Sequence, residues 1–132
     1  MASELRVNTL KDAAGNNSIA TSFVANGSAK ASINFTQVST QTIRSSTNIS
    51  SLADSGTGQT SSISFTSPMA NSLFAGSFYQ NGTTGTARNN FNNDYAGGFG
   101  DKVTNSFGTY SYNDSGAADS AMNDVIIYGD LA

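Results

Sequence analysis

Apolar and polar residues alternate along residues 26–36, and this stretch gives the clearest structural signal in the chain. The residues of one parity are apolar, namely Ala29, Ala31, Ile33 and Phe35, while those between them are polar. A period of two is typical of a strand with one face on a core and the other in water. The Asn26-Gly27 pair favours a tight turn before the strand, because both residues tolerate positive φ. We therefore expect this strand to open the domain, with Ile33 and Phe35 in the core.

Weaker versions of the pattern recur downstream, at residues 42–52, 59–66, 73–80, 106–112 and 124–128. The first predicts an edge strand followed by a turn at 53–58, and the second ends before Pro68, which removes a ladder donor. Residues 73–80 have large apolar side chains of both parities, as in a central strand or one packed between subunits. Residues 106–112 place Tyr110 and Tyr112 on one face of a strand.

The remaining stretches predict loops. Residues 83–103 are the least regular part and predict a long loop with embedded aromatic residues, and residues 113–123 predict another loop. No helical period is sustained, and a single turn of helix at 117–122 is the most that the pattern allows. The chain is thus predicted to be all-β, with about six to eight strands in an antiparallel β-sandwich, jelly-roll-like or immunoglobulin-like.

The first 25 residues are polar and turn-rich, with weak alternation at Leu5, Val7 and Leu10 and a second weak strand at 18–24. Two interpretations stay open: an edge hairpin of the same domain, or an extended N-terminal arm that docks on another protein. We divide the chain into an arm or attachment segment, residues 1–25, and a sandwich domain, residues 26–132. The candidate docking residues are Leu5, Val7 and Leu10.

Composition narrows the function. Charged residues are 11% of the 132 residues, against about 25% in typical soluble domains, so we expect much of the surface to be covered by copies of the same chain. The net charge of −3 and the scattered cations argue against a nucleic-acid partner. No apolar run is long enough for membrane insertion. Cysteine is absent, which excludes thiol chemistry and disulfides.

Histidine is also absent, which excludes histidine triads and histidine metal ligation. Catalysis would have to rest on aspartates, and without tryptophan in a small sandwich we expect no enzyme. Asp114, Asp119 and Asp124 recur at a spacing of five, but no run has the close spacing of a calcium loop, so loop-capping carboxylates are favoured. We expect no cofactor and no metal. The loop aromatics Phe91, Tyr95 and Phe99 predict either a subunit interface, which we favour, or stacking on a host surface glycan.

Four stretches resemble small structural proteins of marine bacteriophages. They are residues 3–10 followed by 12–17, residues 27–35, residues 43–52 with Asp54 and Thr57-Gly58, and residues 125–132. The resemblance spans nearly the whole chain and departs at residues 35–37, where relatives often carry a glycine-rich turn. The first hairpin is therefore expected to differ from theirs.

The resemblance implies a tail-fibre-like protein or other virion appendage without enzymatic activity, commonly a homotrimer. Its partners would be copies of itself and other virion proteins of the capsid or tail, and its location the virion, assembled in the host cytoplasm. A symmetric assembly of low-charge β units agrees with this expectation. Two alternatives stay open: a decoration protein on the capsid surface, and a carbohydrate-binding module that recognises a host receptor.

Overall fold

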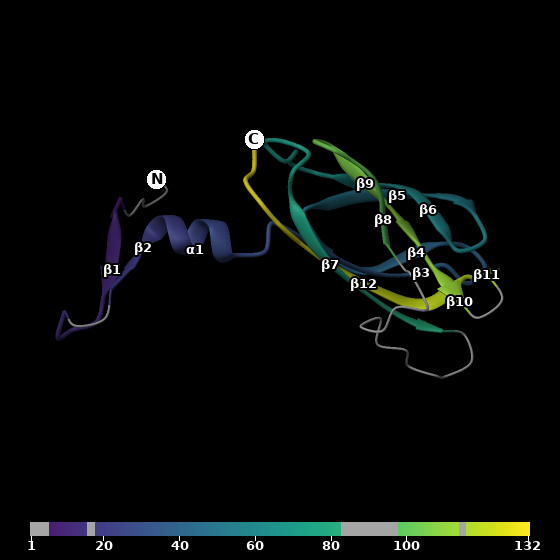
Figure 1. Ribbon diagram of the computed structural model, residues 1–132, viewed down its shortest axis with the longest axis horizontal. Coiled ribbons are helices and arrows are strands. Elements are labelled where there is room, and N and C mark those ends of the chain that lie inside the picture. The colour runs from purple at the N-terminus through teal and green to yellow at the C-terminus, as the bar shows by residue number, and fades with distance from the viewer. Residues whose placement is uncertain (1–5, 16–17, 83–97, 114–115) are drawn as a thin grey trace.

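The computed structural model describes residues 6–15, 18–82, 98–113 and 116–132. Two antiparallel sheets of four strands each pack face to face (Figure 1). The first sheet has the order β4 (Thr42–Thr47), β3 (Ala31–Thr36), β12 (Ser120–Tyr128), β7 (Ala75–Gly82). The second has the order β5 (Ile49–Gly56), β6 (Gln59–Phe65), β9 (Ser106–Tyr110), β8 (Gly98–Val103). The predicted all-β sandwich is confirmed, although its strand order differs from that of an immunoglobulin domain.

Strand β3 follows the pattern read from the sequence. Ala31, Ile33 and Phe35 are buried, and the alternate positions are half-exposed. Its neighbour β12 runs antiparallel, with Val125 opposite Ile33, so both strands send apolar residues into the same core. Ala29, also expected on the inner face, lies before the strand and is exposed. The alternation therefore identified the strand correctly but extended it too far toward the N-terminus.

The chain changes sheets at Asn48, in the middle of the single edge strand expected over residues 42–52. Asn48 has a positive φ of 56°, and its side chain binds the backbone of Ser67 through two hydrogen bonds of 2.7 and 3.0 Å. β4 therefore ends in the first sheet, and β5 begins in the second. The expected turn at 53–58 is wrong in its start, because β5 continues to Gly56. Asparagine tolerates the left-handed conformation that this corner requires.

Three other expectations are wrong. Among the described residues, β7 pairs with β12 alone and so lies at the edge of its sheet; of the two interpretations of residues 73–80, the central strand is therefore wrong. Residues 113–123, expected as a loop, contain β11 (Gly116–Ala117), which pairs with β10 (Tyr112–Asn113), and then the first residues of β12. Residues 98–103 of the expected long loop form β8, and the rest of that loop lies outside the described residues.

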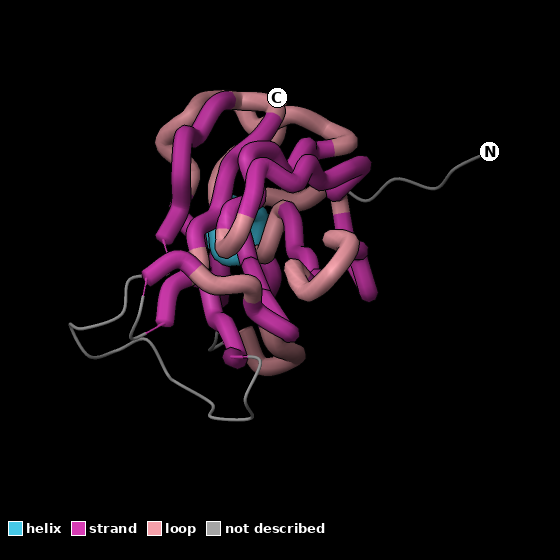
Figure 2. The backbone as a smooth tube through the Cα atoms, turned by 90° about the vertical axis from the view of Figure 1, so that its right-hand side faces the viewer, coloured by secondary structure: helices cyan, strands magenta, loops and turns pink. Residues whose placement is uncertain are grey.

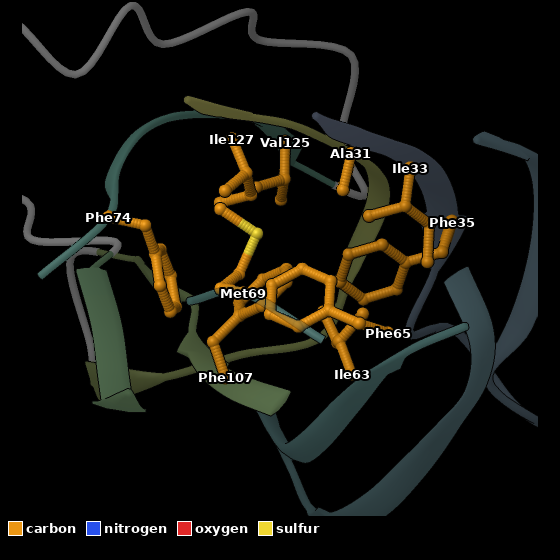
Figure 3. Packing of buried hydrophobic residues seen from close by; sticks show 10 residues of the cluster. All are labelled: Ala31, Ile33, Phe35, Ile63, Phe65, Met69, Phe74, Phe107, Val125 and Ile127. Carbon is orange, nitrogen blue, oxygen red and sulfur yellow. The ribbon is translucent and has the colours of Figure 1, made fainter. Parts of the chain in front are cut away.

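The apolar core fills one part of the space between the sheets (Figure 3). Phe65 packs against Phe74 and Phe107 with ring centroids 5.5 Å apart in both pairs, distances typical of favourable aromatic contacts. Met69 and Phe74 come from the connection between β6 and β7, and both are buried. This connection therefore closes the core at the end of the sandwich where the C-terminus lies (Figure 1).

Buried polar side chains form a second cluster, toward the end of the sandwich that carries β10 and β11. Its members are Gln37, Gln41, Thr60, Ser111, Ser120 and Asn123. The Gln37 Oε1 atom accepts hydrogen bonds from the Ser120 N–H at 3.1 Å and from Asn123 Nδ2 at 3.4 Å. Thr60 Oγ1 donates to Gln41 Oε1 at 2.7 Å. Each of these six side chains has a hydrogen-bond partner, so the cluster links strands of both sheets. Among the other buried polar atoms of the described residues, Gln80 Oε1 and Thr109 Oγ1 have no partner.

The described residues before β3 contain β1 (Thr9–Lys11), β2 (Ser18–Ala20) and the helix α1 (Thr21–Gly27). We call them the N-terminal segment. They lie off the end of the sandwich near the C-terminus (Figure 1), and a view along the long axis shows α1 in line with the sandwich rather than on its flank (Figure 2). The helix corrects two expectations, since residues 18–24 are only partly strand and Asn26-Gly27 ends a helix instead of forming a hairpin turn.

Candidate functional site

The hairpin and the helix of the N-terminal segment are joined into one unit. Leu10 of β1 lies opposite Ile19 of β2. Thr21, the first residue of α1, connects the helix to the residues just before β1: its N–H donates to the Asn8 carbonyl at 3.0 Å, and its hydroxyl donates to the Val7 carbonyl at 3.1 Å. At the other end of the helix, the Ser28 N–H donates to the Val24 carbonyl at 3.1 Å.

None of the described residues of this unit is buried. Its apolar side chains are exposed, and Phe23 is the most exposed of them at 74%; the others are Val7, Leu10, Ile19 and Val24. Two strands of three residues are marginal in water on their own, and so is a helix of two turns without a capping side chain. The segment therefore presents apolar surface that no part of the described sandwich covers.

The predicted docking residues fall into this unit. Val7 and Leu10 are exposed there, and Leu5 lies outside the described residues. Phe23 and Val24 also belong to this exposed surface. They were not expected there, because the sequence predicted a strand over 18–24, whereas α1 begins at Thr21.

Of the three aromatic residues predicted to lie in a long loop, Phe99 lies in a strand instead. Phe99 lies on β8, where its ring packs against Phe107 with centroids 5.6 Å apart. A Cβ added at Gly76 would collide with the Phe99 ring. The glycine therefore leaves room for this ring between β7 and β8, the strands at the edges of the two sheets. Phe99 is thus a packing residue as well as a half-exposed one. Phe91 and Tyr95 lie outside the described residues.

Tyr110 and Tyr112 form a pair of neighbouring aromatic rings. The single strand expected over residues 106–112 is wrong, because β9 ends at Tyr110 and Tyr112 begins β10 in a separate two-stranded sheet. The rings of Tyr110 and Tyr112 have centroids 6.5 Å apart and planes inclined by only 21°. Each side chain is 37% exposed. Their place on one face was predicted from the spacing of two, whereas their parallel arrangement depends on the neighbours described below.

The described aspartates support loops and strands. Asp119 accepts a hydrogen bond from the Gly58 N–H at 2.7 Å, and Asp54 accepts one from the Gly56 N–H at 2.9 Å, as expected of loop-capping carboxylates. Asp124, in contrast, lies within β12 and accepts from Asn34 Nδ2 at 2.5 Å. Within the described ranges, no group of three acidic side chains is placed to hold a metal ion. Asp94 and Asp114 lie outside these ranges.

Across the described part of the chain, no helix is both long and apolar enough to cross a membrane. Comparison of the sequence with protein-family models and with curated proteins, and of the structure with solved structures, found no match. The class that the geometry defines is an all-β sandwich with an uncovered apolar segment at one end.

Proposed function

We propose that the chain is a non-enzymatic structural subunit of a bacteriophage virion, a tail-fibre-like or other surface appendage protein that self-assembles and attaches to the particle through its N-terminal segment. The observation that carries the proposal is the exposed apolar surface of this segment. In a monomer in water, the five exposed apolar side chains of this hairpin and helix contribute no stabilisation through burial. Burial of the same side chains against a partner stabilises both the fold of the segment and the assembly.

Charge supports association between copies. The first 30 residues hold three of the six cations, Arg6, Lys11 and Lys30, but only two of the nine acidic residues, Glu4 and Asp12. The sandwich is therefore the acidic part of the chain. Contacts between the N-terminal segment of one copy and the acidic sandwich of another copy are therefore electrostatically favourable and would stabilise a larger assembly. The resemblance to phage structural proteins supports the virion as the place of that assembly.

The first experiment measures mass in solution by light scattering. We expect the full chain to form an oligomer, about three times 13.6 kDa in mass if the assembly is a trimer. Phe23→Ser should weaken the oligomer, because it removes the most exposed apolar ring of the segment. The matched control is Leu73→Ser: Leu73 is 87% exposed but belongs to the sandwich, so this variant should associate like the full chain. A monomeric full chain would refute self-assembly.

The second experiment tests attachment to the particle. A chain lacking residues 1–27 should fold but fail to incorporate into virions, whereas the Leu73→Ser chain should incorporate normally. The cut falls after Gly27 rather than after Ala25, because α1 runs through to Gly27. Normal incorporation of the truncated chain would show that attachment does not depend on the segment.

A further inference from the structure

Tyr110, at the end of β9, and Tyr112, in β10, form an exposed aromatic pair that we call the platform. β10 lies at the end of the sandwich away from the N-terminal segment (Figure 1). From its geometry we infer that this platform is a binding site for a neutral carbohydrate, with a pyranose ring stacked on the tyrosine rings. The inference does not depend on the proposed virion assembly, because it rests on the sandwich alone. It also differs from the site expected at Phe91, Tyr95 and Phe99.

The platform is rigid because the residue between the two tyrosines is fixed. Ser111 is fully buried, and its N–H donates to the Gly58 carbonyl at 2.7 Å. Its hydroxyl donates to Asn123 Oδ1 at 3.1 Å, and its carbonyl accepts from the Ala118 N–H at 3.0 Å. With the backbone anchored in this way, both tyrosines are held at the surface without being ordered by a ligand.

Each tyrosine has a further support. A Cβ added at Gly100 would lie 2.8 Å from Tyr110 Cε2, so the Tyr110 ring rests directly over this glycine. The Tyr112 carbonyl accepts a hydrogen bond from Gln80 Nε2 at 2.9 Å. The two ring planes are nearly parallel, inclined by 21° with centroids 6.5 Å apart, and the anchored backbone and the Gly100 contact restrict the movement of the rings. A preorganised surface of this kind loses little conformational entropy when a ligand binds.

The surroundings select the class of ligand. Among the described residues, those paired with the tyrosines across the ladders are Gln59, Gly98 and Ala117, and none of them is a large apolar residue. A protein hot spot instead needs a broad ring of contacts that excludes water. A pyranose places C–H groups on one face and hydroxyls around its rim, which matches an aromatic surface bordered by an amide, backbone groups and water.

Charge distinguishes a neutral sugar from an anionic ligand. The whole chain carries a net charge of −3, and in the second sheet the cation Lys102 is turned away, with its Nζ bound to the Phe74 carbonyl at 3.0 Å. Among the described residues of the platform and its ladder partners there is no lysine or arginine to hold a phosphate or sulfate. Nucleic-acid bases also stack on tyrosine, but their backbone requires a cationic groove.

The test is a titration of the full chain with four neutral disaccharides, namely maltose, cellobiose, lactose and mannobiose, followed by NMR of the tyrosine ring protons. We expect saturable binding of at least one disaccharide, with shifts at Tyr110 and Tyr112. Tyr112→Ala should weaken that binding about tenfold, the size expected for the loss of one stacked aromatic contact. Tyr110→Ala should do the same, and Tyr112→Ala keeps the test valid if the Gly100 contact makes Tyr110→Ala unstable.

Two further variants locate the effect. Tyr112→Phe keeps the ring and should keep binding within about threefold, since stacking needs the ring rather than the hydroxyl. Tyr128→Ala is the matched control, because Tyr128 is 38% exposed but lies on the other sheet. Absence of binding to all four sugars, loss of binding in Tyr112→Phe, or an equal loss in Tyr128→Ala would each overturn the inference.

Discussion

The sandwich and the N-terminal segment each contain an isoleucine and a phenylalanine close together in the chain, but the side chains are buried in one region and exposed in the other. In β3, Ile33 and Phe35 are two residues apart, on one face of a strand, and are 2% and 0% exposed. In the segment, Ile19 and Phe23 are four residues apart, at the β2–α1 junction, and are 44% and 74% exposed. Apolar residues are buried only where a second layer covers them, and the segment has no such layer in the described chain.

The difference teaches that the two regions have different sources of order. The sandwich is stabilised by its own core, whereas the described residues of the segment are held by backbone and side-chain hydrogen bonds and bury no apolar side chain. Substitutions at matched positions should therefore separate the regions by their effect on the free energy of unfolding. We expect the difference between the two regions in the free energy of unfolding to be largest for substitutions of aromatic side chains. We expect the smallest difference in the free energy of local opening at backbone amides.

The largest effect is expected from Phe35→Ala, which should lower the free energy of unfolding by about 3–5 kcal/mol, because a fully buried ring is replaced by a cavity. Phe23→Ala should change it by less than about 0.5 kcal/mol in the dissociated protein, since the ring is already in water. Urea unfolding followed by tyrosine fluorescence measures both. Equal losses would show that Phe23 belongs to the same cooperative core as Phe35.

Two glycines with nearly the same backbone angle give the next comparison. Gly58 has a φ of +68° and Gly15 a φ of +72°. A Cβ at Gly58 would meet the Ser111 carbonyl and lie 2.7 Å from the Ala118 N atom, whereas a Cβ at Gly15 meets nothing within 4 Å. Gly58→Ala should cost about 2–4 kcal/mol, from the left-handed conformation and the clash together.

Gly15→Ala should cost only the free energy of placing alanine in the left-handed conformation. Because Gly15 lies in the segment, the urea midpoint of sandwich unfolding should not change. The same urea titration measures both glycine variants. A Gly58→Ala protein as stable as the Gly15→Ala protein would mean that the Gly58 loop moves aside without loss, and the close packing of this loop would then have no role in stability.

These positions also show how far the sequence predicts the structure. The period of two identified the strands β3 and β6 and the buried Ile33 and Phe35 of β3, because a strand between a core and water leaves that pattern in the sequence itself. The pairing partners leave no such pattern. The change of sheet at Asn48, the edge position of β7 and the long β12 all depend on contacts between residues far apart in the chain.

The candidate sites were predictable to a similar degree. Val7 and Leu10 were identified from weak alternation, and Tyr110 and Tyr112 were placed on one face by their spacing. Phe23 was missed because a helix of seven residues is too short to show a helical period. Phe99 was assigned to a loop because glycines on both sides of it hide the strand pattern, although Gly100 serves to accept the Tyr110 ring.

A buried amide and an exposed hydroxyl extend the comparison to polar groups. Gln37→Ala removes the acceptor of the Ser120 N–H and of Asn123 Nδ2, both of which are buried. We expect a loss of about 1–3 kcal/mol from the orphaned donors. Thr21→Val removes hydrogen bonds that are exposed to water and should change sandwich stability by less than about 0.5 kcal/mol. Thermal unfolding of the two variants at one protein concentration distinguishes them, and a Gln37→Ala protein with unchanged stability would show that water replaces the amide.

The smallest effect concerns two backbone amides that lie on either side of the boundary. The Ser28 N–H donates to the Val24 carbonyl at the end of α1, and the Lys30 N–H donates to the Ile127 carbonyl at the start of the sandwich ladder, with distances of 3.1 and 2.8 Å. In dilute protein, Ser28 should exchange with deuterium after opening that costs less than about 1 kcal/mol, whereas Lys30 should exchange several times more slowly. Because a partner covers the segment in an assembly, protection at Ser28 should rise with protein concentration while that at Lys30 stays constant.

NMR-detected exchange at two concentrations measures both amides. Equal protection at every concentration would place the segment within the cooperative unit of the sandwich and remove the distinction between the two regions.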